Sequence, residues 1–215
     1  GNLLSTFNTF MRTDQNGARM IWNTPYSQFV RGELTLGRTW IFGKNGGQSI
    51  ATRLLAGAGY AYGNSTALPF EKHFYGGGAN SLRGWQARTV GPGLALMDDS
   101  FVIPNQTGDM KLEANIEYRF NMFWKVAGAV FADAGNIWTI REYDEQPGGQ
   151  FKFTTFYKDL ALSYGIGFRF DFGLFVFRLD GAMKAINPAY DGRERFPVIC
   201  PKFGRDFALH FAIGY

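Results

Sequence analysis

Large apolar side chains alternate with small or polar ones in the segment RDFALHFAIGY (205–215). From Phe207 onward, the opposite face of an extended chain would carry the small residues Ala208, Ala212 and Gly214 together with His210. Because the period is two, the segment predicts a β-strand whose faces meet different media, which fits lipid outside and a crowded lumen inside. The large residues that share the apolar face are Phe207, Leu209, Phe211, Ile213 and Tyr215.

The same alternation recurs along the chain. It is regular in 50–62, 111–120, 160–171 and 174–184, less strict in 30–42 and 124–138, and weakest in 3–10. With the terminal segment this predicts eight strands. Each is near the nine to eleven residues that a tilted strand needs to cross a bilayer.

The connections between these segments alternate between long and short. Long polar connections lie at about 13–26, 64–106, 141–156 and 187–204, and short ones at 43–48, 121–122 and 172–173. Outer-membrane barrels have short periplasmic turns and long external loops, whereas a soluble β-sandwich has no reason to sort its loops. We therefore predict an all-β fold: an antiparallel up-and-down transmembrane β-barrel in a Gram-negative outer membrane, with both chain ends periplasmic.

Composition agrees with a barrel and argues against other classes. Aromatic residues make up 17% of the 215 residues, yet no apolar run approaches the roughly 18 residues of a transmembrane helix. The net charge of +4 comes from scattered residues, which argues against a nucleic-acid partner. Cys200 is the single cysteine, so an internal disulfide and a multi-cysteine metal site are excluded. We expect no cofactor, metal or catalytic residue, because neither His73 nor His210 accompanies a recognisable nucleophile motif.

The segment FYGGGANSLRGWQARTVGPG (74–93) is too rich in glycine to be a strand. Its glycines allow positive φ and close packing, and no Gly-Lys-Ser/Thr follows that would make a phosphate cradle. Within the long connection at about 64–106, such a segment predicts a plug that folds into the barrel lumen. Its tip is Arg83-Gly84, and the surrounding motif residues are Gly76, Gly77, Gly78, Leu82 and Trp85.

These residues carry a family resemblance. FYGGGANSLRGW resembles the loop motif of the BamA/TamA (bacterial surface antigen) superfamily of outer-membrane assembly factors, whose Arg-Gly-aromatic tip folds back into the barrel. ANIEYRF (114–120) and VFADAGNIW (130–138) resemble the strands that follow that loop. The terminal strand is similar to the family's C-terminal signal, although it ends in Tyr215 where Phe is commoner. Bacteroidetes-type members are the nearest resemblance.

The resemblance implies a function and partners. Family members insert or export other outer-membrane β-proteins through a lateral seam whose edge templates an incoming strand. Client proteins, periplasmic domains of the parent chain, accessory lipoproteins and the bilayer would be the partners, and no enzymatic activity is implied. A passive pore or small structural barrel is the alternative, and an outer-membrane hydrolase is a more remote one.

Strand parity adds a candidate site. Glu117 and Asp133 fall on inward faces, where an arginine entering the lumen would meet both carboxylates. A guanidinium is a planar fork of donors suited to such a pair. We therefore expect Arg83, Gly84, Glu117 and Asp133 to latch the loop inside the barrel. A solvated Arg83, or a catalytic pair of Glu117 and Asp133, are the alternatives.

Closure of the barrel is the open architectural question. Family members usually have sixteen strands after soluble periplasmic domains, which implies that residues 1–215 are a single C-terminal barrel domain of a longer protein. Eight strands closed on themselves leave an interior that side chains fill, with room for little more than a loop tip. Open edges in lipid would leave backbone groups unpaired. For the isolated chain we therefore expect a closed eight-stranded barrel, with half of a sixteen-stranded barrel and a two-chain assembly as alternatives.

Overall fold

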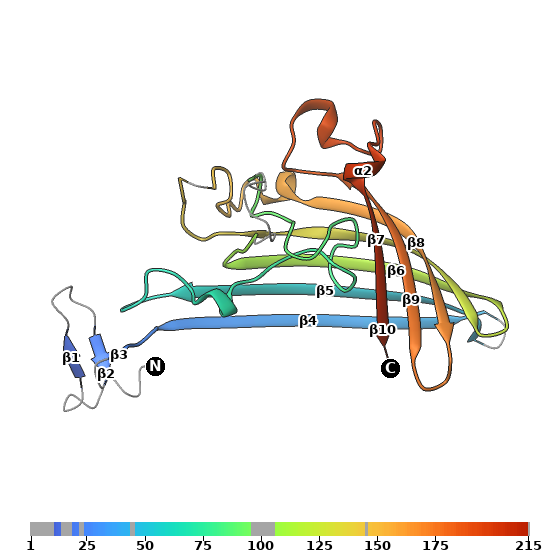
Figure 1. Cartoon of the computed structure of the whole chain (residues 1–215), viewed down its shortest axis with the longest axis horizontal. Coiled ribbons are helices and arrows are strands. Elements are labelled where there is room, and N and C mark those ends of the chain that lie inside the picture. Colours follow the sequence, from blue (N-terminus) through green and yellow to red (C-terminus); the bar gives the residue numbers. More distant parts are fainter. Residues whose placement is uncertain are drawn as a thin grey trace.

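The computed structural model describes residues 11–13, 19–21, 24–43, 46–95, 106–144 and 146–214. Its main element is a seven-stranded antiparallel sheet in which strands adjacent in sequence are also adjacent in space, in the order β10-β9-β8-β7-β6-β5-β4 (Figure 1). The predicted all-β, up-and-down architecture is confirmed. The strands are β4 (Phe29–Phe42), β5 (Gln48–Ala61), β6 (Met110–Phe123), β7 (Val126–Trp138), β8 (Ala161–Asp171), β9 (Val176–Ile186) and β10 (Phe207–Gly214).

The N-terminal region holds a separate small sheet. Three short strands pair in the order β1-β2-β3: β1 (Met11–Thr13), β2 (Arg19–Ile21) and β3 (Thr24–Pro25). The predicted connection at 13–26 therefore contains strands of its own. The predicted strand at 3–10 lies outside the described residues.

Two hairpin boundaries differ from the prediction. The turn expected at 121–122 is wrong, because β6 continues to Phe123 through a register irregularity and the chain reverses at Trp124-Lys125. Trp124 has φ 49°, a left-handed conformation that the strand pattern does not reveal. Similarly, β9 begins at Val176 instead of Leu174, after a turn in which the Phe172 amide donates to the Phe175 carbonyl at 3.0 Å.

The two faces of the sheet are chemically distinct, as predicted. Phe207 and Phe211 on β10 are 42% and 63% exposed, although both are large and apolar. Glu117, Asp133 and Asp180 point to the other face and are buried. Exposed aromatic side chains also gather near the short turns, as in the aromatic girdle of an outer-membrane barrel. They are Trp40, Phe42, Phe123, Trp124, Phe172 and Phe175.

The inner face is covered by the described part of the connection between β5 and β6, residues 62–95 and 106–109, which crosses the sheet in Figure 1. Glycines on β5 make room for it. A Cβ at Gly57 would lie 2.5 Å from the Phe74 ring, and one at Gly59 would lie 2.7 Å from Leu68. Phe74 and Leu68 are buried against these positions.

The sheet is open, so the closed eight-stranded barrel that we expected is wrong for this structure. Within the described residues, β4 and β10 are edge strands and do not pair with each other. The covered inner face supplies a physical reason, since an eight-stranded barrel has space inside for side chains but not for a loop of this size. Half of a larger barrel and a two-chain assembly are the alternatives compatible with the open sheet.

The helices within the described residues are short and lie in the long connections. They are η3 (Phe70–Lys72), η4 (Phe156–Asp159), η5 (Gly192–Arg195) and α2 (Phe203–Asp206). In the part of the chain that the structure describes, no helix has the length and apolar character needed to cross a membrane.

Candidate functional site

The loop tip, residues 78–85, is a compact turn built on glycine. Gly77 and Gly78 have φ 90° and 96°, and a Cβ at Gly77 would lie 2.1 Å from the Gln86 carbonyl oxygen. The turn is closed by the Gly78 amide, which donates to the Trp85 carbonyl at 2.8 Å, and by the Gly77 amide, which donates to Ser81 Oγ at 3.1 Å. Glycine is therefore required at Gly77 by both conformation and space.

Arg83 extends from this tip into the sheet and is 4% exposed. Its Nε and Nη2 donate to the two carboxylate oxygens of Asp133 on β7, both at 2.8 Å. Its Nη1 donates to Glu117 Oε2 on β6 at 2.5 Å, and its backbone amide donates to Asp133 Oδ2 at 3.1 Å. The structure thus brings together the three charged residues of the candidate site in a bidentate geometry.

The Arg83 guanidinium also stacks on an aromatic ring. Its central carbon lies 3.4 Å from the centroid of Phe131, which comes two residues before Asp133 on the same face of β7. Burial lowers the pKa of Arg83, but the hydrogen bonds and negative charge of Asp133 and Glu117 outweigh it, so the net pKa is raised. The guanidinium is therefore held in its charged form.

Other strands extend this contact into an inner ion network. Arg169 on β8 lies 3.0 Å from Glu117 Oε1 and 2.5 Å from Asp180 Oδ1 on β9, which joins β6 to β8 and β9. Because these charges are buried together, each carboxylate is compensated by at least one cation. We define the inner ion network as Arg83, Glu117, Arg119, Asp133, Arg169, Arg178 and Asp180.

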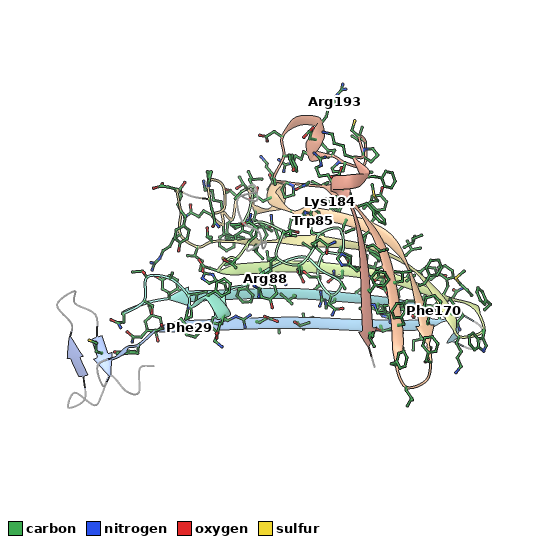
Figure 2. The ribbon with its side chains drawn as sticks, viewed as in Figure 1. Phe29, Trp85, Arg88, Phe170, Lys184 and Arg193 are labelled. Atoms are coloured by element: carbon green, nitrogen blue, oxygen red, sulfur yellow. The ribbon has the colours of Figure 1, made fainter. Side chains whose placement is uncertain are left out.

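The backbone of the tip packs directly on β8. A Cβ at Gly84 would lie 2.6 Å from the Ser163 Cβ, so a side chain at this position would push the tip away from the sheet. Leu82 and Trp85 flank the Arg83-Gly84 pair and are buried in a cluster with Val90 and Ala161. Trp85 and Lys184 of β9 lie beside each other in Figure 2, with Nζ 5.4 Å from the indole ring.

The terminal strand also contacts the tip, which the sequence did not reveal. His210 on β10 is buried, and its Nε2 donates to the Arg83 carbonyl at 2.8 Å. Parity indicated that His210 points inward, but the path of the loop was needed to find its partner. Arg83, Gly84 and Trp85 together therefore touch side chains from all five strands β6 to β10.

Smaller polar contacts fix the remainder of the tip. Asn115 on β6 donates to the Ser81 carbonyl at 2.9 Å and to Asp133 Oδ1 at 2.8 Å. Ser81 Oγ donates to Glu113, and Arg53 on β5 donates to the Asn80 carbonyl at 2.6 Å. Sequence reasoning missed this set. Strand parity predicts that these side chains face the lumen, which was the one available signal for them. Parity does not predict which loop atom each side chain contacts.

The other candidate residues have different surroundings. Leu209 and Ile213 on β10 are exposed, like Phe207 and Phe211, while Tyr215 lies outside the described residues. His73 forms a hydrogen bond with the Leu68 carbonyl at 3.0 Å, and Cys200 is exposed. Gly76 does not have positive φ but faces Val90 closely, with a Cβ 3.2 Å from that side chain. Across the described ranges, no cluster of three His, Cys, Asp or Glu side chains is placed to hold a metal ion.

Comparison with known proteins points to one family. A family model described as the Omp85 superfamily domain matches residues 22–214. The outer membrane protein assembly factor BamA of Neisseria meningitidis serogroup B is 29% identical over 126 residues, which cover 56% of this chain. The crystal structure of BamA from Haemophilus ducreyi lacking POTRA domains 1-3 has a similar fold, with a TM-score of 0.61 at 16% identity over 92% of this chain.

The match covers only part of each relative. The alignment spans 16% of the Neisseria protein and 36% of the Haemophilus chain. The chain thus spans only a part of the length of these larger relatives.

Proposed function

Because the chain belongs to the Omp85 superfamily, we propose that it forms the C-terminal barrel part of an outer-membrane factor that inserts other β-proteins into the membrane. At the level of the family, a role in outer-membrane protein assembly or translocation is supported by the relatives that it resembles. The observation that carries the more specific proposal is the contact of one loop tip with the terminal strand and with the five strands before it.

The proposed mechanism uses this tip as a latch. Arg83 ties β6 and β7 together through Glu117 and Asp133, and its carbonyl holds β10 through His210. The curvature of the sheet and the position of its last strand are therefore set from inside the lumen. The outer edge of β10 has no partner strand in the described residues, and its backbone groups are suited to templating an incoming strand by β-augmentation.

The proposed energetics require no nucleotide and no enzymatic step. A client strand that pairs with β10 exchanges water for backbone hydrogen bonds and buries its apolar face in lipid. His73 and His210 both form hydrogen bonds with backbone carbonyls in this structure, which is a structural use of each ring. We therefore assign neither residue to hydrolysis.

Orientation, domain organisation and partners belong to the same proposal. We place the short turns on the periplasmic side and the long connections outside. The seven strands β4 to β10 then put Phe29 at the outer end and Gly214 at the periplasmic end, so the proposal that both chain ends are periplasmic includes the further crossing strand predicted at 3–10. The proposed partners are client β-proteins, accessory lipoproteins and periplasmic domains of the parent chain. Residues 1–215 act as one barrel domain in this scheme.

Site-specific photocrosslinking tests the templating role. A benzophenone amino acid at Leu209 on β10 of the full-length protein should give adducts with newly made outer-membrane β-proteins in cells. The matched control is Leu54, which is similarly exposed on β5, a strand paired on both sides. Equal adducts from both positions would contradict templating at β10. Absence of adducts together with steady ion conductance in planar bilayers would favour the passive pore instead.

A further inference from the structure

The connection between β7 and β8 folds back over the outer face of the sheet. Trp138 belongs to the outward series of β7, where Val130 is half exposed, yet Trp138 itself is 0% exposed. Phe151 and Phe156 cover it with ring centroids 5.4 and 6.5 Å away. This end of the outer face is therefore shaped by the loop as well as by the strands.

An apolar groove of about 400 Å³ lies where the loop meets the sheet. Alanines on neighbouring strands form its floor, because their small side chains leave a depression between larger residues. Glu113 also borders the groove, but its carboxylate lies on the inner face, where it pairs with Arg53 and Lys111. Its principal walls and floor are Leu34, Leu54, Leu112, Ala134, Phe156 and Leu160.

Three cations lie in or beside the loop segment that lines this groove. Lys158 lies in η4 between the lining residues Phe156 and Leu160, and the Lys152 carbonyl accepts a hydrogen bond from the Phe156 amide at 2.9 Å. Both lysines are exposed. Arg195 donates to the Lys158 carbonyl, which brings a third cation to the same place. The nearby carboxylate of Asp159 is buried and accepts a hydrogen bond from the Trp138 indole at 3.3 Å.

Exposed aromatic side chains accompany these cations. Phe153 is 84% exposed, and Tyr157 is also exposed with Lys158 Nζ 5.9 Å from its ring. Aromatic rings of this kind occur at the level of lipid headgroups in membrane proteins. If these rings lie at the headgroup level, the groove would face the acyl region and the lysines the phosphate level.

We propose that this groove binds one acyl chain of a phosphate-bearing anionic membrane lipid, with Lys152 and Lys158 holding the lipid phosphate. The apolar walls match a hydrocarbon chain, and the basic rim matches an anionic headgroup at the membrane surface. The proposal rests on the outward face lying in the bilayer and does not depend on the assembly role. A failed insertion assay would therefore count against the assembly role alone, and a failed lipid-binding assay against the lipid site alone.

Native mass spectrometry of the full-length protein in detergent tests the site. The protein is titrated with phosphatidylglycerol or with phosphatidylcholine of identical acyl chains. The wild type should retain one phosphatidylglycerol molecule at about thirtyfold lower concentration than phosphatidylcholine, an advantage on the order expected of two lysines at an anionic lipid headgroup. The double variant Lys152→Gln/Lys158→Gln should lose most of this preference.

A charge-matched control is available in other loops. Lys72 and Lys202 are exposed, so Lys72→Gln/Lys202→Gln makes the same change in net charge and should leave the preference unchanged. Equal losses in the two double variants would mean non-specific attraction and would overturn the proposal.

The apolar part has its own test. Ala134→Leu fills the floor of the groove and should weaken retention of both lipids by about threefold or more, a loss on the order expected when one or two methylene groups leave an apolar site. Unchanged lipid retention would overturn the acyl-chain site. A dimer mass that disappears in Ala134→Leu would instead identify a second copy as the occupant and would likewise overturn it.

Discussion

At the scale of single residues, Arg83 is the contact on which the loop depends. Asp133 accepts three hydrogen bonds from it, whereas Glu117 retains Arg119 and Arg169 as further partners. Loss of the guanidinium would consequently leave Asp133 with Asn115 as its remaining side-chain donor in the described part of the chain. The two carboxylates are therefore not equivalent, although the sequence placed both opposite the same arginine.

Replacing Arg83 tests this directly. Arg83→Ala should lower the free energy of unfolding by about 3–5 kcal/mol, because it leaves a buried carboxylate uncompensated. Arg83→Lys should lose less, since it keeps the charge but not the planar fork. Chemical unfolding, with trypsin sensitivity of the 62–95 region as a second measurement, would show the effect. Lys72→Ala serves as the exposed control, and equal loop protection in Arg83→Ala and wild type would refute the latch.

Gly84 is a separate requirement of the same tip. In Gly84→Ala the new methyl group would meet Ser163 at 2.6 Å, so the expected loss of stability is about 1–3 kcal/mol. Removing the opposing Cβ in Gly84→Ala/Ser163→Gly should restore part of that loss. Gly32→Ala is the control, because a Cβ there meets nothing within 4 Å. Identical unfolding curves for Gly84→Ala and Gly32→Ala would contradict the close approach.

His210 couples the tip to β10. His210→Leu should leave the buried Arg83 carbonyl without this donor, at a cost of about 1–3 kcal/mol, and His210→Gln should recover some of it. Hydrogen exchange should speed up in both β10 and residues 78–85, because the contact joins them. Faster exchange confined to β10 would show that the tip does not sense the terminal strand. His73→Gln is the matched control on the other histidine.

At the scale of elements, the connection before β10 is stabilised by charge. Burial of Asp206 raises its pKa. Hydrogen bonds from Arg205 and from the Lys202 amide, together with the charges of Arg205 and Lys184, lower the pKa by more than burial raises it, so the net pKa lies below the usual 3.8. A depressed carboxylate pKa stabilises the fold above the unfolded value, and this contribution is lost as pH falls through the folded one.

Residues 202–206 should therefore loosen below about pH 4. Hydrogen exchange of the Lys202 amide, corrected for its intrinsic rate, would report the change between pH 6 and pH 3. Asp206→Asn should remove this pH dependence, because the titrating group is gone. A variant that keeps the same acid response as the wild type would assign it to another group.

The strands themselves were predictable because lipid and lumen sort side chains with a period of two. Glu117 and Asp133 followed from that parity, and the resemblance supplied Arg83 as the third member. Parity alone could not find the Arg169–Asp180 pair, because that contact depends on the register in which Gly167 faces Asp180. It could not find Trp124 either, since a left-handed residue in a turn leaves no periodic signal.

At the scale of the whole molecule, the open sheet implies a need for further strands. Both β4 and β10 present backbone groups that lack a strand partner in the described residues. In lipid, each unsatisfied group costs several kcal/mol, so an edge as long as β4 is not tolerated alone. Closure by the chain on itself would require the loop to leave the inner face, and with it the buried Arg83 contacts.

Residues 1–215 refolded alone in detergent should consequently associate through these edges. The edge strands β4 and β10 of one copy would pair with the edge strands of the second copy, or with strands formed by residues beyond the described ones. The loop tips of both copies would then stay inside the enlarged lumen. Native mass spectrometry should show dimers, and amides of β4 and β10 should exchange slowly within them. A monomer in which both edges exchange slowly while Arg83 becomes accessible would establish the closed eight-stranded barrel, because self-closure and a filled inner face are mutually exclusive.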